Sequence, residues 1–495
     1  MRAALTPQAA GNSAGAALII IRRQGVGGMR AVNRVLMAAC LLCGAAHADG
    51  LRDIGAAIGA QNRGQYEIGI VLYTSAILDP QLSVHDRKVA FYDRADAYQA
   101  EGEYDLAIGD YSALLRLDPQ HTWAYYNRGE SYWSKGDKDK AIADFDQVVR
   151  LDPRNARAWC SRGNAYRARY DYQQALSDYD TALRLNAADA WIWFNRAIAY
   201  GDQGESGRAI ADYDQALRLD PRYEQAYLYR AQAYRSAGSP GQAIADYGQA
   251  LRLNPNNAAA WYNRANLYGA TGEIERAIAD YDRALSLSPK NAWAWFNRAG
   301  MHLSHGDYEA AIADYQKSMS LKLDNADARF GLGSARFFAG RYAEAADDFD
   351  HALAMPADST LALLSGSGPG EGNTELRYHL IWRYLARRRA GQDAAPELRS
   401  AAAALGDTAW PSPVIAYLLG TIDADRLLAL AEDPDPARRQ QQQCEAGAYL
   451  AESSLLAGDP ASARQRFEQA RTQCPPSFVE YNLANAELRR LAPSH

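Results

Sequence analysis

Helix-ending prolines recur every 34 residues through most of this 495-residue chain, without an insertion or deletion between them. A period of this length fits two antiparallel helices that bury their apolar faces only when neighbouring hairpins stack. The spacing therefore predicts an all-α solenoid. The prolines are Pro119, Pro153, Pro221, Pro255 and Pro289, with Ala187 and Leu323 at the two remaining steps.

Each repeat carries the same pattern of small and bulky residues. Counting slots 1 to 34 from the first residue, eight gap-free copies span residues 88–359. In the second copy, Gly129 is the small residue of slot 8 and Ala141 is the alanine of slot 20. Aromatic residues occupy slots 4 and 24, as Phe145 does here, and we expect them to fill the interior between closely spaced helices. Glycines such as Gly136 predict a left-handed turn between the two helices.

These columns resemble the tetratricopeptide repeat family, whose members are right-handed superhelices of helix-turn-helix units. The resemblance implies a concave face that binds other proteins and is lined by slots 2, 5, 9 and 12 of the first helix. Aromatic side chains at these slots exceed what packing at slots 4 and 24 requires, and asparagines recur at slot 6. The candidate groove residues are Trp123, Tyr126, Asn127, Trp133, Trp191, Phe194, Asn195, Tyr262, Asn263, Trp293, Phe296 and Asn297, and Phe330 continues the pattern in the eighth copy.

Two charged columns are unusual. Slot 7 is arginine in seven successive copies, and slot 23 is aspartate in all eight. Two interpretations are open: a structural ladder of ion pairs, or a stripe of arginines on the concave face that binds an anionic ligand. The matching numbers favour the ladder. Its residues are Arg94, Arg128, Arg162, Arg196, Arg230, Arg264 and Arg298, with Asp110, Asp144, Asp178, Asp212, Asp246, Asp280, Asp314 and Asp348.

The N-terminal segment has the features of a secretory signal. Residues 1–28 are rich in alanine and glycine and contain no acids, and a different pattern begins at Met29, which we expect to be the start. A basic stretch from Arg30 precedes a short apolar run and a small-x-small cleavage site ending at Ala48. These features predict cleavage after Ala48 and a location in the periplasm or outside the cell. Lipid attachment at Cys40 in the outer membrane is the alternative, with a shorter apolar run before it.

The pattern divides the chain into five parts. They are the N-terminal extension and signal peptide (1–48), a degenerate capping repeat (49–87), the eight repeats (88–359), a glycine-rich linker (360–375), and a C-terminal helical section (376–495) with a last hairpin (444–477) and a capping helix. Cys444 opens that last hairpin and Cys474 closes it, so the two lie at adjacent ends and predict a disulfide in an oxidising compartment. Cys160 is left over, and we expect it to be buried.

The C-terminal section resembles the envelope lipoprotein family known as new lipoprotein I over about 115 residues. The matching residues are Trp382, Tyr384, Leu385, Ala386, Trp410, Tyr417, Leu418, Gly420, Tyr449, Leu450, Leu455, Gly458, Asp459, Ala463, Phe467, Phe478, Val479, Glu480 and Tyr481. The resemblance implies an adaptor that brings peptidoglycan hydrolases to a periplasmic processing protease. The chain departs from that family in having more repeats and a signal of the non-lipidated kind.

Composition and motifs exclude several functional classes. Without the signal segment the chain has 48 basic and 59 acidic residues, and this net charge of −11 argues against nucleic-acid binding. His302 and His305 are spaced as a metal pair, but the sequence places no third ligand, and we expect His302 to pack. The sequence predicts no catalytic residues, no metal, no cofactor and no transmembrane span. We therefore expect a periplasmic scaffold or adaptor for other proteins; the alternative is a glycan- or peptidoglycan-binding module that uses the aromatic groove.

Overall fold

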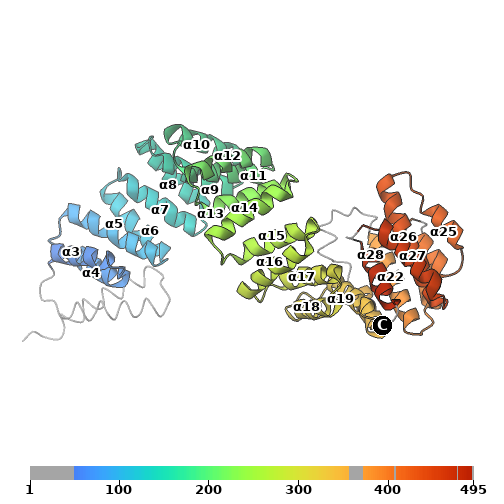
Figure 1. Cartoon of the computed structure of the whole chain (residues 1–495). Coiled ribbons are helices and arrows are strands. Elements are labelled where there is room, and N and C mark those ends of the chain that lie inside the picture. Colours follow the sequence, from blue (N-terminus) through green and yellow to red (C-terminus); the bar gives the residue numbers. More distant parts are fainter. Residues whose placement is uncertain (1–48, 356–371, 406–408, 476–477, 493–495) are drawn as a thin grey trace, which may run out of the picture. The chain divides into compact units, whose positions relative to one another are not determined.

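The computed structural model describes residues 49–355, 372–405, 409–475 and 478–492 (Figure 1). Over these residues the chain forms 25 helices and no strand, which confirms the predicted all-α array of hairpins. The chain divides into two compact units, Met1–Ala233 (unit 1) and Tyr234–His495 (unit 2). The predicted signal peptide, and most of the predicted glycine-rich linker, lie outside the described residues.

Unit 1 is a run of paired helices in which α3 through α12 each pack against the next. The helices are α3 (Gly50–Gln61), α4 (Tyr66–Leu78), α5 (Val84–Ala100), α6 (Tyr104–Leu117), α7 (Thr122–Ser134), α8 (Lys138–Leu151), α9 (Ala156–Ala168), α10 (Tyr172–Leu185), α11 (Ala190–Asp202) and α12 (Ser206–Leu219). Helix α13 (Glu224–Ser236) begins in unit 1 and ends in unit 2. Figure 1 shows the hairpins following one another in chain order.

Unit 2 combines further hairpins with the C-terminal helices. The hairpin helices are α14 (Pro240–Leu253), α15 (Ala258–Ala270), α16 (Ile274–Leu287), α17 (Ala292–His305), α18 (Tyr308–Ser320), α19 (Ala326–Phe338) and α20 (Tyr342–Ala354). The C-terminal helices are α22 (Gly372–Arg389), α23 (Ala395–Leu405), α24 (Ser412–Leu418), α25 (Ala424–Leu430), α26 (Pro436–Leu456), α27 (Pro460–Gln473) and α28 (Val479–Arg490). The last hairpin thus begins at Pro436, before the predicted residue 444, because Asp435 caps the helix and proline suits its first turn.

The helices end at turn residues and begin at capping residues that recur at fixed slots of the repeat. The turn glycines, such as Gly136, have positive φ, as expected of left-handed turns. In the third copy Tyr170 takes this place, with a φ of 63°. Slot 34 supplies side chains that cap the next first helix: Asn155, for example, accepts a hydrogen bond from the backbone N–H of Ala158. Each hairpin therefore starts and stops at positions that the repeat specifies.

Small residues at slot 8 leave room for the aromatic ring of slot 24. A Cβ added at Gly163 would lie 2.8 Å from Cε1 of Tyr179 and 3.2 Å from the carbonyl oxygen of Ala175. Tyr179 itself is fully buried. Close packing of the two helices in this hairpin therefore depends on the missing side chain.

Replacing Gly163 by valine is expected to destabilise α9 and α10 by about 2–3 kcal/mol, because the extra methyl groups overpack the space held by Tyr179. Native-state hydrogen exchange of the two helices measures this cost. Gly201→Val is the matched control: it lies in a first helix, a Cβ there meets nothing within 4 Å, and the change is expected to be within about 0.5 kcal/mol of neutral. Equal losses from the two substitutions would contradict the packing argument.

The C-terminal section of unit 2 is built around Trp382 of α22. This side chain is fully buried among Phe337 and Phe338 of α19 and Tyr449 of α26, with edge-to-face ring contacts to all three. Helix α28 packs against α27, α26 and α19. The section is therefore joined to the last regular repeat through a common apolar core.

The predicted disulfide is present. Cys444 in α26 and Cys474 after α27 are bonded, and their Cα atoms lie 4.9 Å apart. Cys160 is a buried free thiol in α9. Within the described part of the chain, no helix combines the length and the apolarity that a membrane span requires.

Candidate functional site

The arginine column is held between adjacent hairpins. Arg162 donates from Nε and Nη2 to the two oxygens of Asp178, at 2.8 and 2.7 Å, and from Nη1 to Asp146 of the preceding copy, at 2.6 Å. Burial raises the pKa of the Asp178 carboxyl, and the hydrogen bonds from Arg162 oppose that rise. The same fork joins Arg94 to Asp110 and Thr74, Arg128 to Asp144 and Ser112, Arg196 to Asp212 and Asp180, and Arg298 to Asp314 and Asp282. Arg264 binds Asp280, and Arg230 binds Asp214.

Slot-4 tryptophans cover these guanidinium groups. The Cζ atom of Arg162 lies 4.6 Å from the ring centroid of Trp159, and the indole N–H donates to the carbonyl oxygen of Pro153 at 3.0 Å. Trp193, Trp261 and Trp295 are placed in the same way. These rings are half-buried. Trp159, Trp193 and Trp295 pack against the buried clusters of their hairpins, as expected of slot 4, and each also covers an ion pair with its outer face. The filled forks also disfavour an anion-binding stripe.

The candidate groove aromatics of unit 1 lie on α7 and α11 and differ in exposure. Trp123 is 60% exposed, and its ring makes an edge contact with Tyr126 at a centroid distance of 6.0 Å. Trp133 and Trp191 are half-buried, and Phe194 is buried. Of these five residues, Trp123 therefore offers the most surface to a partner.

Three of the slot-6 asparagines donate side-chain hydrogen bonds to other groups of the chain. Asn127 donates from Nδ2 to the hydroxyl of Tyr92 at 3.0 Å and to the carboxylate of Asp96 at 3.1 Å, both in the preceding copy. Asn195 donates to the carbonyl oxygen of Trp191 at 2.7 Å. In unit 2 the first arrangement is repeated with Asn297 as the donor and Tyr262 and Asn266 as the acceptors. Asn127 and Asn297 thus join neighbouring hairpins, whereas Asn195 bonds within its own helix α11.

The candidate groove residues of unit 2 lie on α15 and α17. Tyr262, Asn263, Trp293 and Phe296 are all half-buried. Trp293 and Phe296 form the same edge contact as Trp123 and Tyr126, at a centroid distance of 5.8 Å. Pairs of aromatic residues at slots 2 and 5 are therefore a local motif in each unit.

A cavity of about 450 Å³ lies next to Trp123 in unit 1. Burial and the charge of Asp96 raise the pKa of Asp93, which lines this cavity, to about 6. Lys88, also on the wall, is paired with Asp118 at 3.0 Å. The described lining residues are His85, Lys88, Val89, Tyr92, Asp93, His121 and Trp123. Their mixture of rings and charges suits a polar peptide segment better than a purely apolar one.

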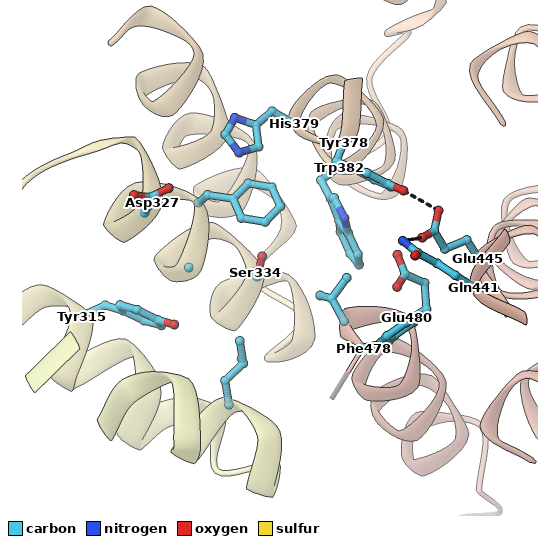
Figure 2. A pocket seen from close by; sticks show the side chains of 14 residues that line it. Tyr315, Asp327, Ser334, Tyr378, His379, Trp382, Gln441, Glu445, Phe478 and Glu480 are labelled. Atoms are coloured by element: carbon cyan, nitrogen blue, oxygen red, sulfur yellow. Dashed lines mark hydrogen bonds between the residues drawn. The ribbon is translucent and has the colours of Figure 1, made fainter. Parts of the chain in front are cut away.

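A second cavity, of about 460 Å³, lies in unit 2 where the concave positions of the last repeat meet the C-terminal helices (Figure 2). We call it the end pocket. One side consists of slots 2, 5, 6 and 9 of the eighth copy, which are Asp327, Phe330, Gly331 and Ser334 of α19, with Leu303 of α17 and Tyr315 of α18. The other side consists of Tyr378, His379 and Trp382 of α22, Gln441 and Glu445 of α26, and Phe478, Val479 and Glu480.

Two buried carboxyl groups lie on the C-terminal side of the end pocket. Tyr378 and Trp410 each donate to one oxygen of Glu445 at 2.7 Å, and Tyr449 donates to Glu480 at 2.9 Å. Burial raises the pKa of Glu445, and burial together with the charge of Glu445 raises the pKa of Glu480. The pKa of Glu480 rises to about 8, so this carboxyl group is protonated at neutral pH. Gln441 donates to the second oxygen of Glu445 at 2.9 Å, so both oxygens of that buried group are hydrogen-bonded.

Sequence reasoning placed Phe330 at a concave slot, and Trp382, Trp410, Phe478, Val479 and Glu480 in the C-terminal resemblance, without bringing them together. Their meeting depends on how α22, α26 and α28 pack against α19, across more than a hundred residues of chain. One signal was present: Gly331 stands where asparagine recurs in other copies, and a Cβ there would lie 2.5 Å from the ring of Tyr315. Among the described residues, no three metal-ligating side chains form a group.

The paired helices of each unit and the ion-pair ladder between their hairpins define a helical-repeat scaffold. Four family models, described as the tetratricopeptide repeat or TPR repeat, match the chain over more than half of its length. The matched residues are 92–156, 126–190 and 320–360; 190–223 and 258–291; 231–272; and 280–313. The chain belongs to the tetratricopeptide repeat family, whose members generally bind other proteins. No curated protein matches the chain in sequence.

Solved tetratricopeptide structures resemble parts of the chain. The C-terminal part of a TPR repeat-containing protein from Cytophaga hutchinsonii is 18% identical, covering 49% of this chain and 97% of that one, with a TM-score of 0.40. A tetratricopeptide repeat protein from Parabacteroides merdae is 22% identical, covering 49% and 96%, with a TM-score of 0.37. A TPR protein from Thermus thermophilus is 25% identical, covering 36% and 98%, with a TM-score of 0.33. At these TM-scores no function transfers from any of the three.

Proposed function

We propose that this protein is an adaptor of the cell envelope that binds other proteins through its concave face. The observation that carries the proposal is Trp123, a large ring at a concave slot that is 60% exposed beside a cavity of about 450 Å³. Exposed aromatic residues next to a cavity are typical anchors of protein interfaces. The features from Arg30 to Ala48 support an envelope location, since they have the form of a secretory signal.

The class of partner comes from the C-terminal resemblance. If this section works as in the new lipoprotein I family, the partners are cell-wall hydrolases or a protease that processes them. The residues that carry the resemblance include Trp382, Phe478 and Glu480, which line the end pocket. The shared pattern therefore includes residues at a surface cavity as well as residues of the core.

Trp123→Ala is expected to weaken partner capture from a periplasmic extract by about 30-fold, because loss of a central aromatic anchor costs about 2 kcal/mol. Cross-linking and mass spectrometry of captured proteins measure the loss. Tyr170→Ala is the matched control, since Tyr170 is also an exposed ring of unit 1, at 78%, but lies at a turn between helices. The control is expected to leave capture unchanged.

Two outcomes would redirect the proposal. If no protein is recovered above the level seen with a repeat-free chain, the adaptor function is excluded. If the protein instead sediments with purified cell-wall sacculi, and Trp123→Ala abolishes that, the alternative of a glycan-binding module is supported, because the Trp123–Tyr126 ring pair would then stack on sugars.

A further inference from the structure

A third cavity, of about 650 Å³, lies in unit 2 beside α23, α24 and α25. We call it the three-helix cavity. All of its described lining residues follow the last repeat, and none of them lines the end pocket. Most side chains of the wall are apolar, and many of these are at least partly exposed, so they offer surface to a ligand. The exposed and half-buried apolar residues are Ala402, Leu405, Ala416, Leu419, Ile422 and Leu430.

Two arginines lie among these apolar residues. Arg399 precedes Ala402 by one turn in α23, and Arg426 precedes Leu430 by one turn in α25, so each shares a helix face with an apolar lining residue. Both arginines are exposed, and among the described residues neither guanidinium group has a hydrogen bond or an ion pair. The described lining contains no acid. An anionic group of a ligand would therefore meet charged donors for which no carboxylate of the wall competes.

Other polar side chains are few on this wall. The described lining has two hydroxyl groups, on Ser412 and Thr421, and that of Thr421 donates to the carbonyl oxygen of Ala416 at 2.8 Å. A peptide that left water here would bring backbone N–H and C=O groups, which are costly to bury without hydrogen-bond partners. A hydrocarbon chain brings no such groups. The wall therefore favours an alkyl chain over a peptide segment as the body of the ligand.

We propose that the three-helix cavity binds a single-chain anionic amphiphile, with its alkyl chain against the apolar wall and its carboxylate or phosphate head at Arg399 and Arg426. A guanidinium group can bind either head through two parallel hydrogen bonds. The cavity volume falls within the range of about 300–1,000 Å³ that is usual for small-molecule sites. This site goes beyond the proposed adaptor function and does not depend on it, because its described lining lies outside the repeats.

The test uses three ligands with ten-carbon chains, which are decanoate, decyl phosphate and the neutral 1-decanol. Their binding to the full chain is measured by isothermal titration calorimetry, below the concentrations at which they form micelles or separate from water. Each anion is expected to bind at least about tenfold more tightly than 1-decanol and to slow hydrogen exchange in α23 and α25. The anion that binds more tightly identifies the head group. In Arg399→Gln combined with Arg426→Gln, the preference for the anions is expected to fall below about threefold.

Matched controls separate the charge of the arginines from the apolar wall. Arg471→Gln removes an exposed arginine of α27 that is not among the described lining residues, and it is expected to keep the full preference for the anions. Leu430→Ser is expected to weaken binding of all three ligands at least about threefold and to leave the preference unchanged. Leu428→Ser is expected to leave binding unchanged, because Leu428 lies in the same helix and is 41% exposed but does not line the cavity. Circular dichroism shows whether each variant is folded.

Two results would overturn the proposal. One is equal binding of the three ligands to the wild-type chain, or no binding of any of them, and Arg399 and Arg426 would then be side chains that lie over an apolar surface with their charges in water. The other is a dimer in sedimentation velocity that dissociates in Leu430→Ser but not with decanoate, which would assign the cavity to a second copy of the chain. Neither result bears on partner capture through Trp123, so the adaptor function is tested separately.

Discussion

Asp178→Ala is expected to destabilise α9 and α10 by about 3 kcal/mol, because the Arg162 guanidinium would remain between the hairpins without its bidentate partner. Asp178 is 3% exposed, and both of its oxygens accept hydrogen bonds from Arg162. In this variant Arg162 would still bind Asp146, so the expected loss of stability is at the low end of the range for breaking a buried ion pair. Native-state hydrogen exchange of the two helices provides the measurement.

Two further variants test whether the loss comes from the contact between Arg162 and Asp178. Asp146→Ala removes the other partner of the same arginine, but the Asp146 side chain is 45% exposed, so we expect a loss below about 1 kcal/mol. In Asp178→Ala combined with Arg162→Met, most of the stability is expected to return, because an apolar side chain needs no counter-charge. Similar losses from Asp178→Ala and Asp146→Ala would contradict the bidentate account.

Loss of the Cys444–Cys474 bond is expected to destabilise the α26–α27 hairpin by about 3–4 kcal/mol, the chain-entropy value for a loop of 30 residues. Because each hairpin contacts mainly its neighbours, the loss should stay in the C-terminal section and leave unit 1 folded. Hydrogen exchange of the full chain before and after reduction measures both parts of this prediction.

A chain with Cys444→Ala and Cys474→Ala serves as the control for the reductant. It is expected to exchange quickly in α26 and α27 with and without the reductant, while α9, which contains the buried thiol of Cys160, exchanges slowly in all samples. Protection of α26 and α27 that survives reduction of the wild-type chain would show that packing around Trp382 suffices to hold them.

The fold could be predicted because the residues that pack against one another in a hairpin recur at fixed positions of the repeat. Gly163 at slot 8 and Tyr179 at slot 24 are in contact within one hairpin, so their columns in the sequence already indicate which helix faces meet. The ladder was visible only in part. Arg162 and Asp178 recur in fixed columns, whereas the second partner occupies slot 25, which is aspartate in five of the eight copies, as at Asp146, but Ser112, Gly248 or Gln316 in the other three. This interrupted column is a weaker sequence signal than slots 7 and 23, and the contact of Arg162 with the preceding hairpin was not predicted from it.

The end pocket could not be predicted, because its two sides come from segments with no common period. Phe330 belongs to a repeat, whereas Glu445 and Glu480 belong to helices whose spacing is irregular. Nor does burial follow from the type of these residues, since glutamates are usually exposed. Their burial depends on the hydroxyls of Tyr378 and Tyr449, which lie elsewhere in the chain.

Because most of the slot-7 arginines bind one aspartate of their own hairpin and one residue of the preceding hairpin, the 34-residue spacing limits which deletions or insertions keep these contacts. If residues 156–189 were deleted as a block, Arg196 would stand sixteen residues after Asp146 and would find there the carboxylate that Asp180 now provides. The contact between the two hairpins that become neighbours would then consist of the same arginine and aspartate side chains as before the deletion. A loss or gain of whole 34-residue blocks, as unequal recombination between repeated gene segments produces, would thus keep each arginine of slot 7 sixteen residues after slot 25 of the preceding copy and preserve the contact wherever that slot is aspartate, whereas a deletion of another size between the two would change this spacing.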